Sequence, residues 1–176
     1  MKLRLAALVL SAVCAISSAY ADDSSREETA RMVSEAIARR GVFKAESLAN
    51  YRELMKALQA QFCPGYRYRH YRAGDSVYVI GKSGDNIVIG RNFKYRVTDS
   101  SADVASIQAS TKGCLEFDVP KNVVALTMTH SVSPEPTEFH LIANLVYGVD
   151  LYVSAESGLW KISGGRVELM RDDKSH

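Results

Sequence analysis

The residues best suited to binding chemistry lie in one segment, Tyr66–Arg72, where tyrosine, arginine and histidine alternate. On a strand, Arg67, Arg69 and Tyr71 share one face and the other four residues share the opposite face. Tyrosine and arginine are enriched as anchors at protein interfaces, and aromatic rings between cations also suit stacking on nucleic acid bases or sugars. The most ordinary interpretation is a half-buried strand with packed tyrosines and solvated arginines. Among the functional interpretations, the sequence favours Arg67, Arg69 and Tyr71 as a protein-binding face.

Two histidines form a second candidate site. His130 and His140 flank a short loop, and Glu138 lies beside the second histidine. If 123–130 and 138–147 pair as a β-hairpin, the three side chains approach one another near its tip and resemble a set of metal ligands. Neither histidine stands at a recognised metal-binding spacing, so ordinary polar residues at strand ends are the simpler interpretation. We expect no metal site and no cofactor.

No pattern typical of a catalytic nucleophile is present. The sequence has no G-x-S-x-G motif, and Gly81-Lys82-Ser83 resembles only the end of a phosphate-binding loop. That loop needs a glycine five residues before Gly81, where Ser76 stands, and a following helix, where the sequence indicates a turn and a strand. We therefore expect no catalytic residue and predict a protein that is not an enzyme.

The N-terminus has the parts of a secretory signal peptide in order. A short positive start precedes the apolar run Leu5–Ile16, and an A-x-A cleavage pattern ends at Ala21. We expect residues 1–21 to be removed and residues 22–176 to fold as a single domain in the periplasm or outside the cell. The mature chain has no N-x-Ser/Thr sequon, so glycosylation gives no support for a eukaryotic route, and we favour the bacterial periplasm.

Two alternatives would attach the chain to a membrane. A spanning helix needs about 20 consecutive apolar residues, whereas this run is shorter and contains Ser11. Lipid attachment at Cys14 would need a small residue just before the cysteine, and Val13 does not fit. We expect neither lipid anchoring at Cys14 nor a transmembrane segment after cleavage.

The charge balance argues against nucleic acid as a partner. The whole chain carries 22 Lys+Arg and 20 Asp+Glu. Lys2 and Arg4 leave with the signal peptide and no acid leaves, so Lys+Arg falls from 22 to 20 and matches the 20 acidic residues. A formally neutral mature chain lacks the basic excess typical of nucleic-acid binding.

Two cysteines, Cys63 and Cys114, remain after cleavage. In an oxidising compartment an isolated pair most simply forms a disulfide bond. The alternative is a pair of buried free thiols. Because the two residues are not in a C-x-x-C arrangement, we expect a structural disulfide rather than a redox centre.

The periodicity of apolar residues changes near Cys63 and indicates the fold class. Helical spacing predicts one helix over 25–40, with Gly41 as its left-handed cap, and a second from Ser47 to Cys63. Short alternating runs then predict antiparallel strands over 66–170, including one at 139–147, while 99–112 fits a short helix or an edge strand. The predicted fold is α+β, with two N-terminal helices (within 22–63) packed on a curved antiparallel β-sheet or half-barrel.

Two functions remain open. The leading hypothesis is a non-catalytic binding module whose partner is another exported or envelope protein, such as an enzyme to be inhibited or an incoming toxin. The alternative is a carrier of an apolar small molecule or lipid, held in a pocket between the helices and the sheet.

Overall fold

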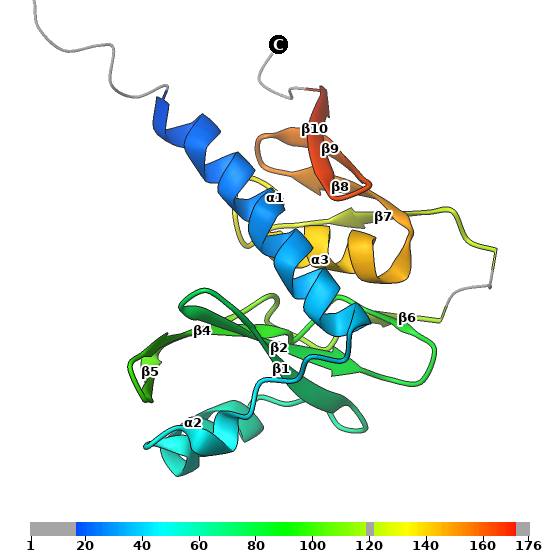
Figure 1. The fold of residues 1–176 in the computed structure, drawn as a ribbon. Coiled ribbons are helices and arrows are strands. Elements are labelled where there is room, and N and C mark those ends of the chain that lie inside the picture. Colours follow the sequence, from blue (N-terminus) through cyan, green and yellow to red (C-terminus); the bar gives the residue numbers. More distant parts are fainter. Residues whose placement is uncertain (1–16, 119–121, 172–176) are drawn as a thin grey trace, which may run out of the picture.

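The computed structural model describes residues 17–118 and 122–171, and Figure 1 labels most of their elements. In chain order they are α1 (Ser17–Ala38), η1 (Ala45–Ser47), α2 (Tyr51–Gln59), β1 (Arg67–Ala73), β2 (Ser76–Lys82), β3 (Ile87–Val88), β4 (Phe93–Thr98), β5 (Ser101–Ala109), β6 (Glu116–Phe117), β7 (Ala125–Thr129), α3 (Glu138–Tyr147), β8 (Asp150–Ala155), β9 (Gly158–Ser163) and β10 (Arg166–Arg171). The predicted mixed α+β class is confirmed. The start of the predicted signal peptide, including Cys14, lies outside the described residues.

The strands are divided between separate sheets, and do not form the single curved sheet that the sequence predicted. Sheet 1 has the order β1-β2-β4-β5, sheet 2 has the order β10-β9-β8-β7, and β3 pairs with β6. All the pairs are antiparallel except β7 with β8, which is parallel. Within 99–112 the chain forms β5 at the edge of sheet 1, which settles the choice between helix and edge strand.

Helix α1 begins and ends earlier than predicted. It starts at Ser17 rather than 25, and it ends at Ala38 rather than 40. The left-handed residue after it is Arg40, with φ 55°, and not Gly41 as predicted. The Gly41 N–H donates to the Ala36 carbonyl at 2.8 Å and the Arg40 N–H donates to the Ile37 carbonyl at 3.1 Å, which is the pattern of a Schellman cap.

Helix α2 is shorter than predicted, because the predicted first turn forms the separate 3-10 turn η1 and α2 begins at Tyr51. Ser47, predicted to cap the helix, lies in the 3-10 turn η1, and Asn50 precedes α2 instead. The Asn50 side chain holds the edge strand β5: its amide donates to the Ala102 carbonyl at 2.8 Å and accepts from the Ala102 N–H at 2.9 Å. Leu54 and Leu58 are fully buried against sheet 1, and each contributes about 2 kcal/mol by burial.

The strand predicted at 139–147 is wrong, because this segment forms helix α3. The segment alternates only if its odd-numbered apolar residues are considered alone, because Ile142 and Val146 between them are apolar too. All residues from Phe139 to Asn144 are buried. Thr137 and the left-handed Gly148 bound the helix at its two ends. Since α3 connects β7 to the parallel strand β8, it is the crossover helix of a β-α-β unit.

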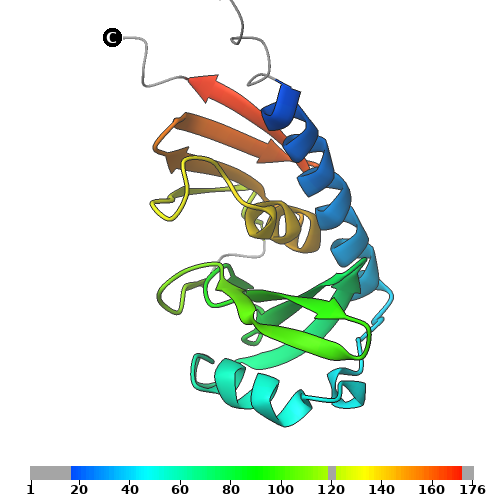
Figure 2. The ribbon, with the colours of Figure 1, turned by 90° about the vertical axis from the view of Figure 1, so that its left-hand side faces the viewer.

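The elements stack in layers, as Figure 2 shows, with α2 below sheet 1, α3 between the sheets, and α1 running along the side of both. Sheet 1 contributes to a hydrophobic cluster on each face. On one face Val77 and Phe93 pack with Leu54 of α2. On the other face Tyr78 and Ile80 belong to a cluster that also contains residues of α1, α3 and sheet 2. The single domain over 22–176 stays a prediction.

The predicted disulfide bond between Cys63 and Cys114 is confirmed, with the sulfur atoms 2.07 Å and the Cα atoms 5.8 Å apart. Cys63 follows α2 and Cys114 precedes β6. The bond therefore ties the end of the α2 segment to the chain that leaves sheet 1 after β5.

We expect reduction of this bond to lower the melting temperature without unfolding the chain at room temperature. The cross-link closes a loop with a sequence separation of 51 residues, which stabilises the folded state by about 4 kcal/mol in the chain-entropy model. The two hydrophobic clusters do not contain the bond and should maintain the fold.

Thermal unfolding of oxidised protein, compared with a Cys63→Ser/Cys114→Ser variant, measures the effect. An unchanged melting temperature would contradict the energetic argument. Two alkylated cysteines in unreduced protein would contradict the bond itself.

Candidate functional site

A basic pocket lies on the face of sheet 1 that carries the predicted binding residues. The register of β1 with β2 pairs Arg67 with Lys82, Arg69 with Ile80, and Tyr71 with Tyr78, so these side chains share one face. The end of α1 borders the same space. The cavity has a volume of about 400 Å³ and is lined by Ile37, Ala38, Arg40, Arg67, Arg69, Tyr71, Ile80 and Lys82. We call this site the basic pocket.

Four cations and no acid line the basic pocket. Arg40, Arg67, Arg69 and Lys82 take part in none of the ion pairs formed within 17–118 and 122–171. Arg67 and Arg69 are exposed, as predicted, but Tyr71 is only 3% exposed and is part of the floor. Burial raises the pKa of Tyr71, and the charge of Arg69 partly offsets this rise. The structure thus brings the three predicted residues together, with the tyrosine below the two arginines.

Packing explains most of the opposite face of β1. The ring of Tyr68 stacks on Phe62 with centroids 3.9 Å apart, and its hydroxyl oxygen accepts from the Cys63 N–H at 3.0 Å. His70 lies 3.1 Å from the Tyr95 hydroxyl, measured from Nδ1, and is buried. For these residues the interpretation as a half-buried strand is the better one.

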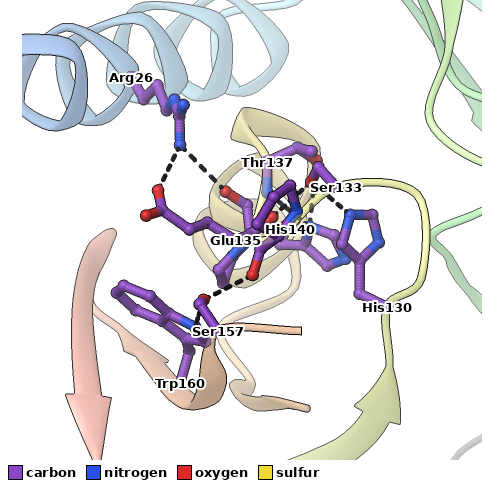
Figure 3. A network of polar contacts seen from close by, with 10 residues as sticks. Arg26, His130, Ser133, Glu135, Thr137, His140, Ser157 and Trp160 are labelled. Atoms are coloured by element: carbon purple, nitrogen blue, oxygen red, sulfur yellow. Dashed lines mark hydrogen bonds and ion pairs between the residues drawn. The ribbon is translucent and has the colours of Figure 1, made fainter. Parts of the chain in front are cut away.

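His130 and His140 do meet, although the hairpin predicted to join them is absent. His130 follows β7, His140 lies in the first turn of α3, and the ring centroids are 4.6 Å apart (Figure 3). Glu138 is not part of the pair, because its carboxylate binds the ammonium group of Lys94 at 2.9 Å. Among the described residues no cluster of three or more potential metal ligands is found.

Hydrogen bonds fix the protonation of both rings. The Ser133 hydroxyl donates its only proton to the Glu135 carbonyl at 2.6 Å, so His130 Nε2 must donate to Ser133 at 2.8 Å. This direction is opposite to the one that a serine nucleophile needs. The Thr137 N–H donates to His140 Nδ1 at 3.0 Å, which places the proton of that neutral ring on Nε2.

Both histidines are held neutral. Burial, and then the proximity of His130, lowers the pKa of His140 to about 3, and burial also lowers the pKa of His130. His140 stands at the position of a capping box where glutamate or glutamine is usual. The pair therefore closes the start of α3 against the Ser131–Thr137 loop.

Sequence reasoning missed Arg40 and Lys82 as members of the basic pocket. In the sequence Lys82 is notable only as part of Gly81-Lys82-Ser83, yet pairing β1 with β2 as a tight hairpin around Gly74-Asp75 would have placed it beside Arg67. No sequence signal places Arg40 there, because its position depends on how α1 ends over sheet 1.

Comparison with known proteins finds no matching family model, no matching curated protein and no matching solved structure. None of the helices in the described ranges has the length and apolar character that crossing a membrane requires. Proposals about function therefore depend on the geometry of the pockets.

We expect a His140→Gln variant to lose part of the acid sensitivity of the protein. The pKa of His140 falls from 6.5 to about 3 on folding, so between these pH values the unfolded chain binds the proton that the folded chain excludes. Stability present above pH 6.5 is lost as the pH falls, by about 2 kcal/mol between pH 7 and pH 5 for this one group. Glutamine keeps an acceptor for the Thr137 N–H and does not titrate.

Urea unfolding at pH 7 and pH 5 measures the difference. His70 titrates in both proteins, so the comparison reports the loss of His140 together with its effect on the neighbouring His130. Equal losses of stability in wild type and variant would contradict a neutral, buried His140. The acids near the pair are Glu135, whose carboxylate contacts Arg26 at 3.4 Å, and Glu156 beside the loop.

Proposed function

We propose that the protein is an exported, non-catalytic binding module that recognises an acidic segment of another exported or envelope protein through the basic pocket. The observation that carries the proposal is the gathering of four cations without an acid around one cavity. In a mature chain with a formal charge of zero, such segregation concentrates positive potential at one place on the surface. A potential of this kind attracts a partner of opposite sign and orients its approach.

The backbone of Arg40 supports a role in binding rather than in folding. Its φ of 55° lies in the left-handed region, which costs a residue other than glycine about 1 kcal/mol or more. Glycine is the usual residue at this position of a helix cap, and here it stands one residue later, at Gly41. Arginine is present at this position although it is unfavourable for the backbone, and its side chain supplies the fourth cation of the basic pocket.

The floor of the basic pocket suits a peptide better than a small inorganic anion. Ile37, Tyr71 and Ile80 lie among the cations. Tyr71 and Ile80 are only 3% and 5% exposed, so the apolar contact offered to a ligand is mainly that of the partly exposed Ile37, while the arginines bind carboxylates with paired hydrogen bonds. An acidic segment with an apolar residue between its acids would use both parts of the site.

The carrier hypothesis has less support. The space between the helices and the sheets is filled by two clusters of buried side chains. Phe93 and Phe139 are buried within these clusters, and Phe117 and Trp160 pack against one of them. Every pocket described here has polar or charged residues in its lining.

Export remains part of the proposal and agrees with the disulfide bond, since such bonds persist in oxidising compartments. The predicted cleavage after Ala21 falls within the first turns of α1 and leaves the chain from Asp22 to Ala38 to form the helix. The intact mass of the secreted protein reports whether it begins at Asp22. A mass that includes residues 1–21 would contradict export through this signal.

Charge reversal at Arg67 and Arg69 should abolish binding to the partner. We expect an Arg67→Glu/Arg69→Glu variant to recover no specific protein from an envelope extract, and wild-type binding to weaken as salt screens the charges. The control is Arg52→Glu/Lys56→Glu, which reverses two exposed cations on α2. Equal recovery by wild type and the β1 variant would contradict the proposal.

The Arg40→Gly variant separates binding from stability within the same assay. Glycine removes the backbone strain, so the free energy of unfolding should stay constant or rise by up to about 1 kcal/mol. Binding should nevertheless fall, because one of the four cations is lost. A stable variant that binds as well as wild type would remove Arg40 from the site.

A further inference from the structure

A second pocket on sheet 1 combines residues from three strands and two helices. Strand pairing places Tyr78 opposite Lys94 and Lys94 opposite Gln108, which makes a row across β2, β4 and β5. Helix α1 and the first residue of α3 close the space above this row. The cavity has a volume of about 260 Å³ and is lined by Ser25, Arg26, Thr29, Tyr78, Lys94, Gln108 and Glu138. We call this site the Tyr78 pocket.

Tyr78 has an unsatisfied polar group at the Tyr78 pocket. The side chain is 0% exposed, and its hydroxyl makes no well-formed hydrogen bond to any residue that the structure describes, although the Glu138 carboxylate lies close enough to interact with it. Leaving a buried hydroxyl unpaired costs about 1–3 kcal/mol. Burial, and then the charge of Glu138 and the interaction of its carboxylate with the hydroxyl, raise the pKa of the phenol, so the hydroxyl stays protonated and able to donate. A polar atom of a bound molecule would remove this cost.

The Tyr78 pocket contains charges of both signs. Lys94 Nζ lies 2.9 Å from the Glu138 carboxylate, and the side chains are only 29% and 17% exposed. Lys94 also lies over the Tyr78 ring, 5.5 Å from its centroid. Arg26, which contacts Glu135 at 3.4 Å (Figure 3), also lines the Tyr78 pocket and supplies a second cation. Glu138 opens α3, where the positive end of the helix dipole favours a negative charge.

From this arrangement we infer that the Tyr78 pocket binds a compact zwitterion, namely a free α-amino acid. The ligand carboxylate lies between Lys94 and Arg26 and accepts from the Tyr78 hydroxyl. The ligand ammonium group binds Glu138. The hydroxyl and amide groups of Ser25, Thr29 and Gln108 remain for a polar side chain.

Other ligand classes match the Tyr78 pocket less well. A simple anion would meet the carboxylate of Glu138, and an uncharged ligand would displace water from Lys94 and Glu138 without supplying groups that replace it. A long peptide does not fit a cavity of about 260 Å³. The site is distinct from the basic pocket, whose lining shares no residue with it, so the two proposals stand or fall separately.

Isothermal titration of the purified exported protein with each of the twenty free amino acids tests the inference. We expect saturable binding of at least one, and loss of binding when its amine is acetylated or its carboxylate esterified. Tyr78→Phe removes only the hydroxyl and should weaken binding about tenfold or more, as expected for a hydrogen bond to a charged group. Tyr152→Phe, on a half-buried tyrosine of sheet 2, is the control and should bind as wild type.

Glu138→Gln is the second variant and keeps the test valid if Tyr78→Phe fails to fold. It should bind the amino acid more weakly and should reduce the difference in affinity between the free amino acid and its acetylated form. The inference is overturned if no amino acid binds, if both blocked forms bind equally well, or if both variants bind as wild type. The last outcome would mean that water alone satisfies the Tyr78 hydroxyl.

Discussion

The burial of α3 between the two sheets is the constraint on which the rest of the structure depends. Its residues from Phe139 to Asn144 are all buried, and the cluster they join includes side chains from α1, sheet 1 and sheet 2. Asn144 fixes the helix to sheet 2: its amide donates to the Val149 carbonyl at 2.9 Å and accepts from the Gly165 N–H at 2.7 Å. A buried amide with its partners in place favours one arrangement over others of similar apolar packing.

Both pockets depend on this placement of α3 and on the helix α1 that packs beside it. Phe139 meets the ring of Tyr78 edge to face with centroids 5.9 Å apart, and Glu138, one residue earlier, binds Lys94 on the same side of sheet 1. Ala30 and Val33 of α1 belong to the same cluster as α3. Because α1 is held there, its C-terminal end brings Arg40 to the basic pocket and its N-terminal half brings Ser25 and Arg26 to the Tyr78 pocket.

Features that depend on residues near one another in the chain could be predicted from the sequence, whereas features that depend on tertiary contacts could not. The disulfide and the helical start depend on composition and short-range periodicity, and the structure contains them. For 99–112 the sequence left a short helix and an edge strand open, and the structure has the edge strand β5. The segment 139–147 was assigned wrongly because it is buried on all sides, and a segment without a polar face has no periodicity that separates helix from strand. Thr137 before it and Gly148 after it were the available signals, since they are typical of the two ends of a helix.

The candidate sites show the same division between local and distant information. Alternation along one strand placed Arg67, Arg69 and Tyr71 on a common face, but only the pairing with β2 adds Lys82, and only the cap of α1 adds Arg40. Tyr78 gave no functional signal in the sequence, since a tyrosine in an apolar strand is most simply a core residue. The structure agrees with this interpretation for the ring, which packs in the core, but the hydroxyl makes no well-formed hydrogen bond there. A polar atom that the core does not satisfy, next to a charged pocket, gives a physical reason to look for a ligand.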